Sequence, residues 1–589
     1  MHSIELLIRK YMAIRSASDG SVAPDGSIYY LSDVTGQMQL WRLHAFNGGY
    51  TGDLVIPWDR RIGGYEIASN GLIAFSSDFN GDERWAIYIY DGKSITRAAG
   101  EDGSMNILGK WNHDGTLLAF TSTMRNGVDF DVYIYDIRRG AAERVYEGEG
   151  ILIVEAWIRD KLLVTKRNTN LDSDILLVDP KRRRAYNLTQ HVGEASNSQP
   201  LPIDGDRFLY ITNADREFNA LALYHLEARK HRVLFSPEWD VELIEYSPFT
   251  GRIYASVNEA GISTLYTLRL HSDKATVERV YRRKWVISKL DSSNGKLLIS
   301  ASSSREGSEV YLLHESLERL TYSPKLGLED YFVEPELFSY NSFDDLRIYG
   351  LLYKPRAPSS DPPPAVIWLH GGPESQARPI FNMLQQAMTS LGIAVAFPNF
   401  RGSTGYGKSF IHLDDLDKRL DAVKDVYYAV EYLASRELVD VDRLCVMGGS
   451  YGGYLTLMSL AMFPDLWKCG VEIVGIVNLV TFILNTSPYR RRYRMHEYGD
   501  PDLHRDIMLS LSPISHVDKI KAPLMVIHGA KDPRVPVSEA EQLVNALRDR
   551  GVEVKYIRLE DEGHGISKIE NRIKVYSEAL LFIMNNLTS

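Results

Sequence analysis

A serine lies at the centre of a glycine-rich turn in the second half of the chain. The sequence GGSYG at 448–452 follows the apolar run 443–448 and precedes an apolar helical pattern. In this context the pattern G-x-S-x-G has a chemical meaning, because a strand that turns sharply into a helix exposes the serine hydroxyl above a sheet. Side chains two residues before and after Ser450 would collide in so sharp a turn, which explains both glycines. We therefore predict that Ser450 is a nucleophile.

A serine hydroxyl needs a general base to remove its proton, and the base needs an acid to orient it. In folds that carry this strand–turn–helix motif, the catalytic residues follow one another along the chain in the order serine, acid, histidine. Asp532 follows the apolar run 524–529, where a carboxylate would stand at the carboxyl edge of a sheet, and His564 is the only histidine after it in the sequence. Other aspartates after the serine are too near it or follow no strand directly: Asp465, Asp500, Asp502, Asp506 and Asp518. We predict a triad of Ser450, Asp532 and His564.

The oxygen that becomes negative when a serine attacks a carbonyl needs backbone N–H donors that are already in place. One donor should be the N–H of Tyr451, the residue after the nucleophile. A second should come from the loop 370–373, HGGP, whose glycines allow the backbone to approach closely. His370 precedes the serine and His528 ends a buried run, so we interpret both histidines as structural.

Apolar runs alternate with helical patterns from about residue 326. The predicted strands, buried on both faces, are 365–370, 393–399, 443–448, 469–477, 524–529 and 552–560, and the predicted helices are 421–437, 453–463, 538–551 and the last segment from Lys568. This alternation predicts a doubly wound, mostly parallel sheet of the α/β-hydrolase type over 326–589. Its catalytic groups should gather at the carboxyl ends of the strands.

A repeat fills the first half of the chain. Turns that end at residues 26, 71, 115, 160, 206, 251 and 295 each precede a β-rich run, so the steps are 44 to 46 residues. A second β-rich run follows each time after a polar gap. The period is long enough for four short strands, and it predicts an all-β, seven-bladed propeller over 19–325. Two β-sandwiches are the disfavoured alternative, because sandwiches do not hold a fixed period through seven copies.

The composition is that of a soluble, folded protein. Of 589 residues, 44% are hydrophobic and 24% are charged, and the net charge of −10 offers no general attraction to nucleic acid or an anionic membrane. Residues 1–18 read as an amphipathic helix that packs on the hydrolase domain, and no segment has the ~20 apolar residues of a membrane span. With only two cysteines, a disulfide framework is excluded and a cytoplasmic location is expected.

Several ordered motifs carry a family resemblance. A propeller before an α/β-hydrolase domain, with HGGP at 370–373, PNFRGSTGYG at 398–407 and GGSYGGY at 448–454, resembles the prolyl oligopeptidase family of serine peptidases. The loops of Asp532 and His564 extend the resemblance over nearly the whole chain. Within the family the chain is most similar to acylaminoacyl peptidases, because a short helix precedes the propeller and Asp532-Pro533-Arg534 is similar to the D-x-R of that branch.

The resemblance implies roles for individual residues. It gives the triad as Ser450, Asp532 and His564, the oxyanion hole as the N–H groups of Gly372 and Tyr451, and Arg534 as the residue that binds a substrate carbonyl. It also implies that the propeller covers the active site and admits only short peptides, that no metal or cofactor is needed, and that the protein is a homodimer or a larger homo-oligomer. The expected activity is release of N-acylated amino acids from peptide N-termini.

Some alternatives stay open. Dipeptidyl peptidases of the family hold a free amino terminus with two propeller glutamates, and no such pair is identified here; Glu217 is interpreted as a solvated loop residue. The segment YRRRYR at 489–494 either favours an acidic substrate or forms a solvated or salt-bridged helix face, and the second interpretation is favoured. An aminopeptidase, a carboxylesterase or amidase with the same triad, and a non-catalytic propeller platform are the other candidate functions.

Overall fold

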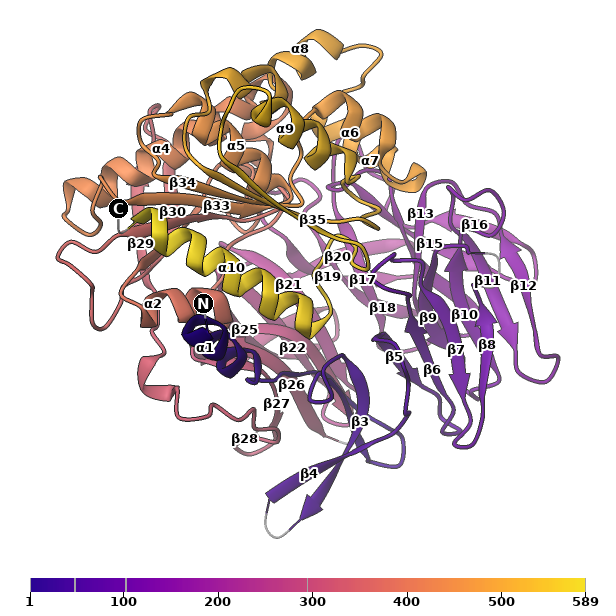
Figure 1. The fold of residues 1–589 in the computed structure, drawn as a ribbon. Helices are drawn as coiled ribbons and strands as arrows, with labels where there is room; N and C mark the ends of the chain where they lie inside the picture. The colour runs from indigo at the N-terminus through magenta and orange to yellow at the C-terminus, as the bar shows by residue number, and fades with distance from the viewer. Residues whose placement is uncertain (1, 47–48, 101–102, 294, 588–589) are drawn as a thin grey trace.

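The chain folds into seven four-stranded sheets followed by one eight-stranded sheet with helices on both sides (Figure 1). The structure is a computed structural model that describes residues 2–46, 49–100, 103–293 and 295–587. The predicted seven-bladed propeller and the predicted α/β-hydrolase fold are both confirmed. The division of the chain after residues 18 and 325 stays a prediction, and residues 1, 47–48, 101–102, 294 and 588–589 of the predicted domains lie outside the described part.

Each blade is a meander in which successive strands pair antiparallel. The strands are β1 (Ala17–Val22), β2 (Ile28–Ser32), β3 (Gln39–Phe46) and β4 (Gly49–Leu54) in blade 1; β5 (Ile62–Ile67), β6 (Ile73–Ser77), β7 (Ala86–Tyr90) and β8 (Ile95–Ala99) in blade 2; β9 (Asn106–Trp111), β10 (Leu117–Ser122), β11 (Asp131–Asp136) and β12 (Ala141–Tyr146) in blade 3; β13 (Ile151–Ile158), β14 (Lys161–Arg167), β15 (Ser173–Asp179) and β16 (Arg184–Asn187) in blade 4; β17 (Asn197–Pro202), β18 (Arg207–Thr212), β19 (Ala220–His225) and β20 (Lys230–Phe235) in blade 5; β21 (Asp240–Ser247), β22 (Arg252–Glu259), β23 (Ile262–His271) and β24 (Lys274–Arg282) in blade 6; and β25 (Val286–Ser293), β26 (Lys296–Ser303), β27 (Glu306–Leu313) and β28 (Leu317–Arg319) in blade 7.

The β-rich runs of the repeat are the second and third strands of each blade, and they form its core. Strand β6 is buried at every position, whereas the fourth strands, such as β4 and β12, are mostly exposed. The ring closes where blade 7 meets β1. There Gly20 N donates to Ser300 Oγ at 2.9 Å and Lys289 Nζ lies 2.8 Å from Asp19 Oδ1.

The eight-stranded sheet has the order β29-β30-β32-β31-β33-β34-β35-β36. Its strands are β29 (Glu336–Asn341), β30 (Arg347–Tyr353), β31 (Ala365–Leu369), β32 (Ala394–Asn399), β33 (Leu444–Gly449), β34 (Cys469–Ile473), β35 (Leu524–Gly529) and β36 (Val554–Leu559). The six strands from β32 to β36 in this order pair parallel, and β29 and β30 add an antiparallel edge. The parallel part places several strand ends at one edge, as predicted.

Helices cover both faces of this sheet (Figure 1). They are α1 (His2–Met12), α2 (Met383–Ser390), α3 (Lys408–Ile411), α4 (Arg419–Ser435), α5 (Tyr451–Met462), α6 (Leu479–Asn485), α7 (Pro488–Tyr498), α8 (Arg505–Ser510), α9 (Ser538–Arg548) and α10 (Ile569–Leu587), with 3-10 turns η1 (Glu329–Tyr331), η2 (His412–Asp414), η3 (Leu416–Lys418) and η4 (Pro513–Lys519). Alternate residues of β33 point to opposite faces of the sheet, and each face has its own hydrophobic core. Leu444 and Val446 pack with α4 and α5, while Cys445 and Met447 pack with α2 and α10.

Two strand predictions were wrong in detail. The strand expected at 469–477 ends at Ile473, because Val474 has a φ of +46° and leaves the sheet. The turn lets helix α5 approach the backbone that follows β34, since a Cβ on Gly453 of α5 would lie 2.7 Å from the Cα of Gly475. The strand at 552–560 was expected to be buried on both faces, but β36 is the last strand of the sheet and several of its side chains are exposed.

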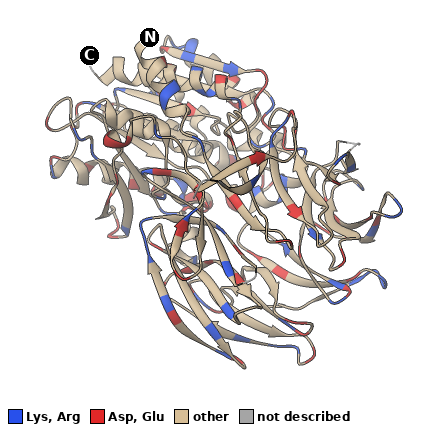
Figure 2. Ribbon diagram, turned by 90° about the horizontal axis from the view of Figure 1, so that it is seen from below, with Lys and Arg blue, Asp and Glu red and all other residues tan. Residues whose placement is uncertain are grey.

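The N-terminal helix packs on the hydrolase part of the chain. It contacts α10 and α2 and buries Ile8 and Tyr11 in the core that they share. The helix ends at Met12, and Ala17 already begins the first propeller strand. No helix in the described part of the chain combines the length and the apolar character needed to cross a bilayer. Acidic and basic residues are interspersed over both halves of the molecule (Figure 2).

Ile8→Ala should destabilise the protein, because Ile8 is only 1% exposed between α10 and α2. Loss of a buried isoleucine side chain costs about 2–5 kcal/mol of unfolding free energy. The matched control is Leu6→Ala on the same helix, because Leu6 is 59% exposed. Urea unfolding should show a lower midpoint for the Ile8 variant only; equal midpoints for both variants would mean that α1 does not dock.

Candidate active site

Ser450 stands at the junction between β33 and α5 in a backbone conformation that side chains rarely adopt. Its φ is +57° and its ψ is −118°, and its N–H donates to Ile473 O at 2.9 Å. A Cβ on Gly448 would clash with Gly452 O, and a Cβ on Gly452 would clash with Leu369 O at the end of β31. The glycines of the motif are therefore required by close backbone contacts, as the sequence predicts.

Asp532 and His564 are brought together at the same edge of the sheet. Asp532 follows β35, and its buried carboxylate accepts the N–H groups of Arg534 and Val535 at 2.8 and 3.0 Å through Oδ1. Its other oxygen, Oδ2, lies 2.6 Å from His564 Nδ1. Because a carboxylate can only accept, Nδ1 carries the hydrogen and Nε2 is left as the basic nitrogen.

A buried glutamate holds the loop that carries this histidine. The carboxylate of Glu562, which is 0% exposed, accepts from the N–H groups of Ser567 and Lys568, both at 2.9 Å. Gly563 lies against the propeller, since a Cβ there would clash with Gly81 O of blade 2. The position of His564 therefore depends on both halves of the molecule.

His564 and Ser450 are not joined by a hydrogen bond in this structure, although both are among the described residues. Bonds between a catalytic base and its nucleophile are often long in free enzymes and shorten when substrate binds. The geometry thus shows the contact between Asp532 and His564 and the strand–helix turn at Ser450, and the third contact of the predicted triad stays a prediction.

The HGGP loop lies beside the serine. A Cβ on Gly371 would lie 3.4 Å from Ser450 Cβ, so the loop and the nucleophile are in contact. Gly372 has a φ of +130°, and a Cβ there would lie 2.7 Å from Glu374 N. Tyr451 is the first residue of α5, so no helix carbonyl accepts its N–H. Both predicted oxyanion donors therefore come from the neighbourhood of Ser450.

The two histidines interpreted as structural have structural contacts. His370 Nε2 lies 2.9 Å from Ser403 Oγ, its ring stacks on Phe400, and burial lowers its pKa to about 4. His528 Nε2 lies 2.9 Å from Val535 O, and burial lowers its pKa too. Both rings are therefore held neutral and packed, which suits a supporting role.

Arg534 is paired with a propeller residue that the sequence does not reveal. Glu83 of blade 2 binds Arg534 Nε at 2.8 Å and Arg534 Nη2 at 2.7 Å through Oε1. The same carboxylate accepts from Arg490 Nη2 at 2.9 Å. The contact joins residues more than 400 positions apart, and no local pattern in the sequence marks Glu83 as a partner.

The arginine-rich segment 489–494 lies on α7 and is salt-bridged, the favoured interpretation. Besides Arg490, Arg492 binds Glu149 of the propeller at 2.9 Å and Arg494 lies 3.5 Å from Glu374. Glu217 is exposed but not merely solvated, because its carboxylate accepts from Ser409 N and Oγ at 2.7 and 2.9 Å. The contacts of Arg492 with Glu149 and of Ser409 with Glu217 join the propeller to the hydrolase part, whereas Arg494 and Glu374 both belong to the hydrolase part.

A cavity of about 840 Å³ lies between the two parts of the chain and reaches Asp532. Its walls come from blades 2 and 3, from the start of α7 and from the loop after β35, and they include Phe79, Glu83, Met105, Tyr489 and Pro533. This volume is in the range of small-molecule sites. The cavity therefore offers a space for a small ligand next to the loop of Asp532, while Ser450 and His564 are not among its walls.

Comparisons with known proteins agree with this arrangement. Residues 379–589 match the model of the prolyl oligopeptidase family. Dipeptidyl aminopeptidase BIII of Pseudoxanthomonas mexicana is 27% identical over 93% of this chain and 84% of its own. The acylamino-acid-releasing enzyme of Mus musculus is 28% identical over 42% of this chain, and the match spans only 35% of that enzyme.

The fold also matches a solved structure over nearly its full length. A puromycin-hydrolyzing peptidase of Mycobacterium tuberculosis superposes with a TM-score of 0.85 at 19% identity, over 99% of this chain and 96% of that one. At this level of identity the likeness concerns the fold alone, whereas the family match concerns the sequence around the predicted site. Residues 379–589 therefore form a prolyl oligopeptidase family domain, and the protein is a serine peptidase.

Proposed function

We propose that the protein hydrolyses short peptides with Ser450 as nucleophile, His564 as general base and Asp532 as the acid that orients the histidine. The observation that best supports this proposal is the 2.6 Å bond between His564 Nδ1 and Asp532 Oδ2. It is made at the carboxyl edge of a parallel sheet in which Ser450 occupies the strand–helix turn. The acid–base pair and the turn are the parts that a serine hydrolase needs.

The reaction follows from these parts. His564 Nε2 takes the Ser450 proton as Oγ attacks the peptide carbonyl, and the N–H groups of Gly372 and Tyr451 hold the resulting oxyanion. His564 then gives the proton to the leaving amine, and the C–N bond breaks to leave an acyl-enzyme. A water molecule, activated by His564, attacks the acyl carbon and frees the acid and the serine.

The substrate class we propose is peptides with an acylated N-terminus, so that the product is an N-acylated amino acid. Asp532-Pro533-Arg534 supports it, and Arg534 would hold a substrate carbonyl with Nη1, because Glu83 binds Nε and Nη2. A second candidate is an aminopeptidase or dipeptidyl peptidase. It is favoured by the relative called dipeptidyl aminopeptidase BIII, which matches 93% of this chain. A carboxylesterase or amidase would use the same residues.

Four further expectations remain proposals. The propeller would restrict access to short peptides, which the cavity between the two parts of the chain supports. A cytoplasmic location is supported by the cysteines, since Cys445 and Cys469 are both free and buried. A homo-oligomer and the domain division 1–18, 19–325 and 326–589 are proposed from the sequence.

Asp532→Asn should lower kcat by on the order of 10⁴-fold with little change in KM. An amide at this position favours the wrong histidine tautomer while the fold is kept. Steady-state hydrolysis of a peptide anilide gives both constants. Asp518→Asn is the control, because Asp518 is exposed on η4. An Asp532 variant as active as the control would remove Asp532 from the mechanism.

Arg534→Ala should impair hydrolysis of a peptide more than hydrolysis of a minimal ester, which has no second carbonyl to hold. Loss of a charge-assisted hydrogen bond is worth about 10- to 100-fold in kcat/KM for the peptide. Both substrates are measured with wild-type and variant enzyme. Equal losses on both substrates would show that Arg534 does not bind the substrate carbonyl.

The acylated-peptide proposal is tested with N-acetyl-alanine p-nitroanilide and alanine p-nitroanilide. We expect kcat/KM for the acetylated compound to be at least about 10-fold higher than for the free amine. This ratio corresponds to a difference of about 1.4 kcal/mol in transition-state stabilisation. Ser450→Ala enzyme is the blank. A preference for the free amine would replace this proposal by the aminopeptidase, and faster cleavage of simple esters than of either anilide would favour the esterase.

A further inference from the structure

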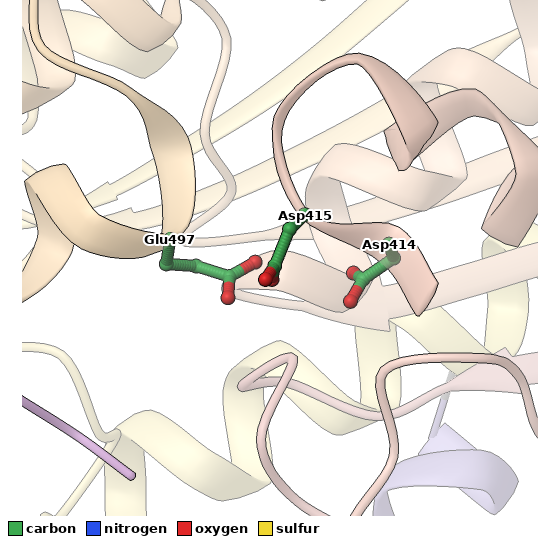
Figure 3. Close-up of side chains that lie close together, drawn as sticks. All are labelled: Asp414, Asp415 and Glu497. Atoms are coloured by element: carbon green, nitrogen blue, oxygen red, sulfur yellow. The ribbon is translucent and has the colours of Figure 1, made fainter. Parts of the chain in front are cut away.

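A buried group of charged side chains lies behind the proposed oxyanion hole. Asp414, Asp415 and Glu497 bring carboxylate oxygens within 4.8 Å of one another (Figure 3). Asp414 ends η2 and Glu497 lies in the last turn of α7, so segments far apart in the sequence meet here. Asp414 is 0% exposed and Glu497 is 3% exposed.

The cation for these carboxylates is already present in the protein. Arg419, the first residue of α4, is fully buried and donates through Nη2 to both the backbone oxygen and Oε1 of Glu497 at 2.7 Å. Its Nη1 lies 3.7 Å from Asp414 Oδ2, and His412 binds Asp415 at 2.7 Å. Because a guanidinium compensates the acids, we assign no metal ion to this cluster.

Two tyrosines connect the cluster to the two proposed donors. Tyr451 OH donates to Asp414 Oδ2 at 2.7 Å, and Tyr498 OH donates to Gly372 O at 3.2 Å. The guanidinium of Arg419 lies 5.3 Å from the Tyr451 ring centroid and 4.4 Å from the Tyr498 ring centroid. The strand–helix turn and the HGGP loop are thus tied to one buried arginine.

We propose that Asp414 and Tyr498 are positioning residues for the oxyanion hole, which they hold in shape through Tyr451 and Gly372. The proposal rests on the proposed function, because it needs the N–H groups of Tyr451 and Gly372 to be the donors. Oxyanion donors stabilise charge only when their positions are fixed before the reaction. Asp414 fixes Tyr451 by its side chain, and Tyr498 fixes the peptide plane next to the Gly372 N–H.

The chemistry of these bonds suits that task. The hydroxyl of Tyr451 donates to a carboxylate, a charge-assisted bond that is stronger than a neutral one. Burial raises the pKa of Asp414 above its usual value, although Arg419 and the Tyr451 hydroxyl act in the opposite direction, so the bond is charge-assisted when Asp414 is ionised. The hydroxyl of Tyr451 bonds to Asp414, and the hydroxyl of Tyr498 bonds to the backbone of the HGGP loop. Both tyrosines would therefore act on the shape of the site and not by contact with substrate.

The test uses three phenylalanine variants from one aromatic group. Tyr451→Phe and Tyr498→Phe each remove a hydroxyl that the proposal uses. Tyr454→Phe is the matched control, because Tyr454 is one turn along the same helix, stacks on Tyr451 at 5.4 Å and donates its hydroxyl at 2.9 Å to Leu511 O, away from the hole. Asp414→Asn is a fourth variant, which keeps an acceptor for Tyr451 and removes the charge.

For each variant we would measure kcat and KM for a peptide anilide, the Ki of a peptidyl trifluoromethyl ketone, and the Tm. The ketone forms a tetrahedral oxyanion on serine and reports the hole directly. We expect Tyr451→Phe and Tyr498→Phe to lower kcat by about 10-fold or more with KM within about 2-fold, and to weaken the ketone in proportion, since loss of a whole donor costs about 10²–10³. Tyr454→Phe should change Tm but neither kcat nor Ki.

Two results would overturn the proposal. One is that kcat and Tm fall by the same amount in all three tyrosine variants, because that result would indicate a packing effect only. The other is that Tyr451→Phe and Tyr498→Phe keep wild-type kcat and Ki. The proposed function fails separately, if wild-type enzyme shows no hydrolysis that Ser450→Ala abolishes, and the positioning proposal then falls with it.

Discussion

The backbone of Ser450 is the constraint on which the rest of the site depends. Its φ of +57° is tolerated only because β33, β31 and α5 meet at glycines, where the carbonyl of Leu369 takes the space that a Cβ on Gly452 would fill. Non-glycine residues in this region cost of order 1–3 kcal/mol and persist where their surroundings enforce them. The same contact fixes β31 next to β33, and so places the HGGP loop beside Ser450.

The propeller contacts the loops of the candidate active site. Gly81 packs against Gly563 next to His564, and Glu83 holds the guanidinium of Arg534. Arg492 and Glu149 add another pair across the same boundary. The catalytic loops therefore take their positions from both halves of the chain. A catalytic domain without its propeller would lack the contact of Glu83 with Arg534 and the packing of Gly81 against Gly563.

Much of this arrangement could be predicted from the sequence, because it depends on periodic or local patterns. The step of 44 to 46 residues gave seven blades, and the glycines around Ser450 marked a turn that tolerates no other residue. The order of serine, aspartate and histidine along the chain identified Asp532 and His564, which the structure joins. The family match over 379–589 covers the later motifs of the resemblance, at 398–407 and 448–454, and the loops of Asp532 and His564.

Other features could not be predicted, because they arise from contacts without any sequence spacing. Glu83 and Arg534 are far apart in the chain. Asp414 and Tyr451 are closer in the chain, but they are still too far apart to belong to one local motif. The strand predicted to reach residue 477 looked continuous because its apolar run continues after the turn at Val474. A hydrophobic pattern predicts which residues are buried. It does not predict the positive φ of Val474, which ends this strand.

The central claim is that Ser450 is the activated nucleophile. The most direct test is to react the native protein with a fluorophosphonate, digest it and locate the adduct by mass spectrometry. An activated serine reacts selectively, so the account predicts one adduct on the peptide that contains Ser450, with loss of hydrolytic activity in the same proportion. Labelling of a different serine with the same loss of activity, or full activity after Ser450 is labelled, would contradict it.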